Sequence, residues 1–125
     1  MDNIIFQDVF NVIQPALPEG WEKMILFVGY TEGSYTMKYF TSDGKGEYTD
    51  CFNQKGLSKA QLIKLFMNID KIVGGERKKL NEKNKWSVMT MIVCKDGSMK
   101  TDFEYSDISE NAIEYEQSWK KKYIK

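Results

Sequence analysis

Histidine is absent from this 125-residue chain, and arginine, proline and cysteine are scarce. Without histidine, the commonest general base and metal ligand in proteins is missing, which argues against catalysis and against a metal site. Arg77 is the single arginine among 18 basic residues, and arginine is the preferred side chain for phosphate and guanine contacts. Because the net charge is also zero, sequence-specific nucleic-acid binding is not expected.

Long apolar runs are also missing. None approaches the roughly 20 residues of a transmembrane helix, and the N-terminus lacks the basic start of a secretory signal. We therefore expect a cytoplasmic protein with no membrane partner, in which Cys51 and Cys94 are reduced core residues rather than a disulfide. A hydrophobic content of 42% is typical of a folded protein, and the length suits a single domain over residues 1–125.

Hydrophobic periodicity divides the first two thirds of the chain into helices and strands. Apolar residues at helical spacing predict a helix over residues 3–16, which Pro15 and Pro18 would end. Strands are predicted over 21–31, 34–41 and 47–52. Ser58 and Gln61 form a capping box that opens a second helix, which we expect to continue to residue 80 although glycines 74 and 75 weaken it.

The last forty residues predict a β-hairpin that leads into a third helix. An Asp96-Gly97 turn joins strands over 86–94 and 98–105, and alternation places Phe103 and Tyr105 toward the core. Asp107 with Glu110 is expected to cap the helix that follows. The order α-β-β-β-α-β-β-α, with short turns between sequential strands, predicts an α+β fold: about five strands in a mainly antiparallel sheet, with three helices.

Charge is strongly segregated in this C-terminal part. Residues 101–117 contain six carboxylates and no Lys or Arg, and residues 118–125 carry four lysines. Acids early and cations late in a helix complement its dipole, and Glu116 with Lys120 has the spacing of a stabilising pair. Helix stability does not explain the acids that precede the helix. If the helix folds back beside the last strand, we expect one partner-binding face made by Asp102, Glu104, Asp107, Glu110 and Glu114.

Catalytic constellations are not found. Asp102 and Glu104 lie on one face of a strand and could share a metal or a proton, but a solvent-facing strand has the same pattern. The cysteines have no histidine partner, and the paired glycines match no phosphate-binding loop. We therefore expect no enzyme, no catalytic, cofactor-binding or metal-binding residues, no cofactor and no small-molecule substrate. An adaptor remains open as an alternative, as does a nucleic-acid-binding regulatory module that uses the basic stretch 71–85.

Short motifs in order along nearly the whole chain resemble one known family. They are Pro18-Glu19-Gly20-Trp21-Glu22, Tyr39-Phe40, Tyr48-Thr49-Asp50, Trp86-Ser87 with Met89-Thr90-Met91, Gly97-x-Met99-Lys100, Phe103-x-Tyr105 and Trp119-Lys120-x-x-Tyr123. Together they resemble the YezG-like immunity proteins, antitoxins of bacterial polymorphic toxin systems.

The resemblance implies a function in protein binding. Members of this family bind a cognate toxin domain, often a nuclease, and block it. The resemblance brings no catalytic residues and no interface map. It implies a cytoplasmic immunity protein whose partner is a basic nuclease toxin, bound stoichiometrically.

Overall fold

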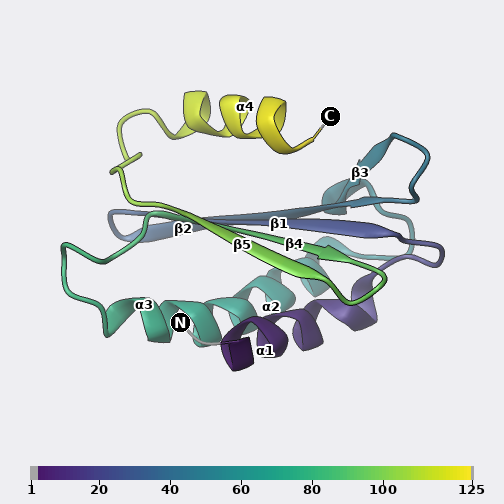
Figure 1. Ribbon diagram of the computed structural model, residues 1–125, viewed down its shortest axis with the longest axis horizontal. Coiled ribbons are helices and arrows are strands. Elements are labelled where there is room, and N and C mark those ends of the chain that lie inside the picture. The colour runs from purple at the N-terminus through teal and green to yellow at the C-terminus, as the bar shows by residue number, and fades with distance from the viewer. Residues whose placement is uncertain (1–2, 125) are drawn as a thin grey trace.

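A five-stranded antiparallel sheet lies between two layers of helix (Figure 1). The computed structural model describes residues 3–124. One helix, α4, crosses the upper face of the sheet, and the other helices cover the lower face. The predicted α+β class and the predicted order of elements are both confirmed.

The elements have the following bounds. The N-terminal half contains α1 (Asn3–Ile13), η1 (Gln14–Ala16), β1 (Lys23–Thr31), β2 (Ser34–Ser42), β3 (Tyr48–Asp50) and η2 (Cys51–Asn53). The C-terminal half contains α2 (Lys59–Ile69), η3 (Asp70–Gly74), α3 (Gly75–Lys78), β4 (Val88–Cys94), β5 (Met99–Glu104) and α4 (Ala112–Tyr123).

The strand order is β3-β2-β1-β4-β5, and each adjacent pair is antiparallel. Tight turns make the β1–β2 and β4–β5 hairpins, and both Gly33 and Gly97 adopt the positive φ that such turns require. The helical segment from α2 to α3 carries the chain from β3 to β4, which then pairs with the free side of β1. The central strand is therefore β1, with β2 and β4 on its two sides.

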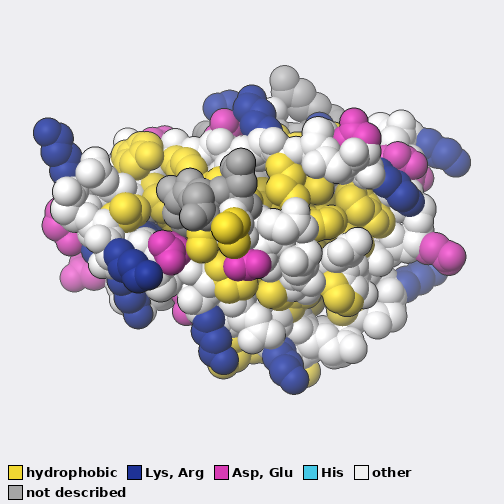
Figure 2. Space-filling model, turned by 60° about the horizontal axis from the view of Figure 1, so that its bottom comes forward, with side chains coloured by type: hydrophobic (Ala, Val, Ile, Leu, Met, Phe, Trp, Pro, Cys, Tyr) yellow, Lys and Arg dark blue, Asp and Glu magenta, His cyan; other side chains and the backbone are white. Residues whose placement is uncertain are grey.

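Apolar side chains on the lower face of the sheet pack against α1 and α2. Val9 and Ile13 of α1 meet Leu62 and Ile69 of α2 in this layer, all at most 1% exposed. From the sheet, alternate residues such as Leu26 enter the same core. Figure 2 shows apolar side chains among charged ones on the outer surface of this layer. Ile63 and Met67 of α2 are half-exposed.

The upper face of the sheet forms a second, smaller core beneath α4. Ile25 and Phe27 of β1, Phe40 of β2 and Trp119 of α4 are its buried members, together with Ile108. Because both faces of β1 are covered, residues 24–29 read in sequence as a continuous apolar run instead of an alternating one.

Element ends differ from the prediction where the chain makes local turns. The first helix is regular to Ile13 and tightens into the 3₁₀ turn η1 around Pro15, which cannot donate a backbone hydrogen bond. The third strand ends at Asp50 instead of residue 52, because the Asp50 carboxylate accepts the Phe52 N–H and starts η2. Tyr105 is 58% exposed, so its expected place in the core is wrong; β5 ends one residue earlier and the chain leaves the sheet there.

The second helix begins as predicted and does not stop at the paired glycines. Ser58 and Gln61 form the reciprocal capping box. One turn of π-helix, η3, then passes directly into α3, which ends at Lys78. Both Gly74 and Gly75 have helical backbone angles. A wide turn of this kind inserts one extra residue without ending the helix.

Candidate functional site

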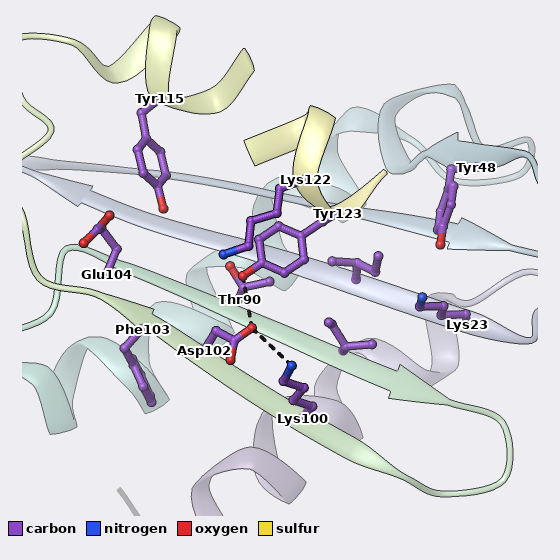
Figure 3. Close-up of a pocket in the computed structure, with 12 residues that line it drawn as sticks. Lys23, Tyr48, Thr90, Lys100, Asp102, Phe103, Glu104, Tyr115, Lys122 and Tyr123 are labelled. Atoms are coloured by element: carbon purple, nitrogen blue, oxygen red, sulfur yellow. Dashed lines mark hydrogen bonds and ion pairs between the residues drawn. The ribbon is translucent and has the colours of Figure 1, made fainter. Parts of the chain in front are cut away.

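A groove of about 720 Å³ lies between α4 and the upper face of the sheet, above β4 and β5 (Figure 3). Its lining combines three lysines, three tyrosines and two carboxylates: Lys23, Lys100, Lys122, Tyr48, Tyr115, Tyr123, Asp102 and Glu104. Ile25, Thr90, Ile92 and Phe103 complete the walls. Residues far apart in sequence meet in this groove because α4 folds back over the sheet.

Contacts made by Trp119 and Glu116 hold α4 in this position. The buried indole Nε1–H donates to Thr90 Oγ1 of β4 at 2.8 Å. The indole packs edge-on against Phe27 at 5.0 Å between ring centroids. One helical turn earlier, Glu116 pairs with Lys38 of β2 at 3.0 Å. A buried hydrogen bond and an aromatic contact fix the distance between helix and sheet, and so the width of the groove.

The structure brings together Asp102 and Glu104 of β5 on the floor of this groove. Both are half-buried, and they line the groove beside α4 instead of lying on an open strand surface. The Tyr123 hydroxyl donates to Asp102 Oδ2 at 3.0 Å, and Lys100 Nζ lies 4.0 Å from the same oxygen. Asp102 therefore has a hydroxyl and an ammonium group beside it.

Glu104 has no such cation among its contacts within residues 3–124. Its Oε2 accepts the backbone N–H groups of Tyr105 and Ser106. Burial raises the pKa of Tyr115 above it to about 12, and the negative charge of Glu104 adds to that shift. The Tyr115 hydroxyl is therefore neutral near pH 7 and presents a proton to this end of the groove.

The other three predicted acids lie outside the groove lining. Asp107 and Glu110 are exposed in the loop between β5 and α4, and Glu114 is exposed in the first turn of α4. The Asp107 carboxylate accepts the Ser109 N–H at 2.9 Å, which lowers the pKa of Asp107. The five predicted acids therefore extend from the groove floor along the loop to the start of the helix.

The expected cap of α4 and the expected ion pair of Glu116 are both wrong. Asn111 occupies the N-cap position of α4 and makes no side-chain capping bond, so Asp107 and Glu110 do not cap the helix. The reason is that Ile108 is buried beneath the loop, 4% exposed, which delays the helix until residue 112. Glu116 pairs with Lys38 of β2 in place of the expected Lys120.

A second cluster, not predicted from the sequence, lies where β1 ends, on the lower face of the sheet. The Tyr30 hydroxyl of β1 donates to Asp70 Oδ1 of η3 at 2.5 Å, and burial together with Asp70 raises the pKa of Tyr30. The Arg77 guanidinium stacks over the Tyr30 ring at 4.8 Å and donates through Nε to the Trp86 carbonyl at 2.6 Å. The single arginine and the paired glycines were the only sequence signals for this cluster.

The cluster accounts for part of the basic stretch 71–85. Arg77 is tied to the sheet, Lys79 pairs with Glu76, and Lys85 pairs with Glu82. A smaller cavity of about 460 Å³ lies beside Arg77 and reaches Asp107.

Within residues 3–124 no helix is long and apolar enough to cross a bilayer, and no three Cys, Asp or Glu side chains converge as metal ligands. Both cysteines are free thiols. Burial raises the pKa of Cys51 to about 12.

Comparison with known proteins identifies the family. A search of the curated proteins found no significant match. The sequence profile of the family described as "Immunity protein YezG-like" matches residues 3–125. Since this match extends through every helix and strand described above, the chain belongs to the family of YezG-like immunity proteins.

Proposed function

We propose that this chain is a non-catalytic immunity protein that binds a cognate toxin domain, a nuclease, in the cytoplasm and blocks it one to one. The observation that carries the proposal is the family match over residues 3–125. The acidic segment adds physical support. A nuclease must attract a polyanion and so tends to be basic around its active site, and an acidic surface on the inhibitor would be complementary to it.

The proposed contact surface is formed by Asp102, Glu104, Asp107, Glu110 and Glu114. Two features of its geometry favour this surface. Glu110 and Glu114 are exposed at the N-terminal end of α4. Glu104 is half-buried in the groove, where its charge is screened less by water than on an open surface, although three lysines also line that groove.

Co-expression tests the immunity function itself. The toxin domain encoded next to this gene is expressed in a host cell with and without the chain. We expect the toxin to stop growth when expressed alone and the chain to restore growth in proportion to its level, as one-to-one binding requires. Failure of both binding and rescue would refute the proposed function.

A matched pair of charge reversals tests the surface. Glu110→Lys with Glu114→Lys changes the charge of the proposed face, and Asp8→Lys with Glu19→Lys makes the same change at exposed positions in α1 and in the loop that precedes β1. We expect the first pair to slow toxin association at least about tenfold at low salt and the control pair to leave it nearly unchanged. The difference should shrink as ionic strength rises. Equal rates for both pairs would refute the surface and leave the immunity function standing.

A further inference from the structure

Strand β5 forms one edge of the sheet, and its backbone has an open side. The Ser98 carbonyl accepts the Cys94 N–H at 3.0 Å, and the Glu104 carbonyl accepts the Ser87 N–H at 2.7 Å. Backbone groups alternate in direction along an antiparallel pair. Even-numbered residues of β5 therefore bond to β4, whereas the N–H and C=O groups of Met99, Thr101 and Phe103 point away from the sheet.

This open side is one of two stretches of unpaired strand edge in the described fold. At the opposite edge β3 pairs with Phe40 to Ser42 and leaves residues 34–39 of β2 without a neighbouring strand on that side, but none of these residues lines the groove, whereas four residues of β5 do. β5 pairs with β4 over six residues, and no strand lies beyond it in the order. In Figure 1, β5 runs along the near side of the sheet with α4 above and α1 below. An extended segment could therefore lie beside β5 without displacing a strand.

Side chains of such a segment would enter the groove under α4. On a strand placed beside β5, alternate side chains would point to the same face as Lys100, Asp102 and Glu104. Lys100 already lies 4.0 Å from Asp102, whereas the contacts of Glu104 in residues 3–124 include no cation. Glu104 is therefore the groove carboxylate without a cation within 4 Å in residues 3–124, although Lys122 also lines the groove, and the Tyr115 ring forms the wall beside Glu104. A Lys or Arg side chain suits this position through charge and through contact with the aromatic face.

We infer that the toxin contributes an extended segment that pairs with β5 as a sixth strand and places a basic side chain beside Glu104. The inference rests on the proposed function, because the toxin is the partner that provides the strand. Main-chain hydrogen bonds to Met99, Thr101 and Phe103 would provide affinity independent of sequence, and the groove would select the basic residue.

Proline at position 101 tests the edge directly. Thr101→Pro removes an outward-facing N–H and adds a ring to the open side, a position where an edge strand tolerates proline. Thr101→Val keeps the N–H and a similar side-chain shape. We expect Thr101→Pro to weaken binding of the neighbouring toxin domain at least about tenfold and Thr101→Val to change it less than about twofold, measured by biolayer interferometry. Circular dichroism and thermal melting check that both variants fold.

Hydrogen exchange of the unmodified complex provides a readout that does not depend on the variants. We expect the amides of Met99, Thr101 and Phe103 to exchange more slowly when the toxin is bound. If the toxin binds but these amides and the affinity of a folded Thr101→Pro variant are unchanged, the edge inference is refuted and the immunity function stands. If the unmodified chain does not bind the toxin at all, the proposed function is refuted and the edge inference with it.

Discussion

Replacement of Gly74 by alanine should destabilise the protein, although alanine is normally the better helix former. A Cβ at position 74 would lie 2.5 Å from Asp70 Oδ1 and 2.9 Å from the Tyr30 hydroxyl oxygen. Contacts this short require the Asp70 carboxylate and the Tyr30 hydroxyl to shift, and we expect this shift to break the 2.5 Å hydrogen bond between them. Gly74 therefore allows the π-helical turn to approach β1 closely.

The magnitude follows from two opposing effects. A hydrogen bond to a charged group contributes about 1.5–3 kcal/mol to the free energy of unfolding. Replacement of Gly by Ala inside a helix raises the free energy of unfolding by about 1 kcal/mol. We therefore expect Gly74→Ala to lower the free energy of unfolding by about 0.5–2 kcal/mol, which for a chain of this length lowers Tm by roughly 2–8 °C.

The neighbouring glycine is a matched control. Gly75 also has helical backbone angles, φ −62° and ψ −44°, and a Cβ there would meet no heavy atom within 4 Å. Gly75→Ala should therefore raise the free energy of unfolding by up to about 1 kcal/mol. Two adjacent glycines in one helix should thus give effects of opposite sign.

Urea denaturation followed by tryptophan fluorescence and far-ultraviolet circular dichroism measures both changes. Trp86 packs against Tyr30 at 5.5 Å between ring centroids, so its emission reports on this region. A second measurement in a Tyr30→Phe background should show a smaller penalty for Gly74→Ala, because the hydrogen bond that the Cβ would break and one of the two close contacts are already gone. Equal or greater stability of Gly74→Ala relative to the unmodified protein would refute this account of the π-helical turn.

Two further predictions concern the attachment of α4. Trp119→Phe removes the buried indole hydrogen bond to β4 and part of the packing on Phe27. We expect it to lower the free energy of unfolding, measured by urea denaturation, by about 2 kcal/mol. A decrease below about 0.5 kcal/mol would contradict the importance of this contact. Burial, with the hydrogen bond to Asp102 and the charge of that carboxylate, raises the pKa of Tyr123. A raised folded-state pKa gives stability that is present below the ordinary tyrosine pKa of about 10 and lost as pH rises through the folded value. The difference in Tm between unmodified protein and Tyr123→Phe should therefore shrink from pH 8 to pH 11, and a constant difference would contradict it.

Local sequence patterns were sufficient for most of the elements. The Ser58–Gln61 capping box fixed the start of α2, because both of its hydrogen bonds are made within four residues. The Asp96-Gly97 turn, with Gly97 at φ 96°, fixed the last hairpin and with it the alternation of β5. These features depend only on residues close together in the chain.

Contacts between distant residues decided what local patterns could not. Ile108 reads as the first apolar residue of a helix, but it is buried beneath the loop, so Asp107 lies in a turn and not at a cap. Glu116 has Lys120 at the favoured spacing, yet Lys38, 78 positions earlier, is its partner. No sequence rule gives these outcomes, because each depends on where α4 lies on the sheet.

The sequence by itself determined the class of fold, the family and the acidic character of the C-terminal segment, because periodicity, turn chemistry and charge are written along the chain. Only the tertiary structure decided how those acids are distributed. By folding α4 back over the sheet, it placed Asp102 and Glu104 on the floor of a groove and left Glu110 and Glu114 exposed at the helix start. The physical reason is the apolar upper face of β1 and β4. That face requires a cover, and Trp119 with its helix supplies it.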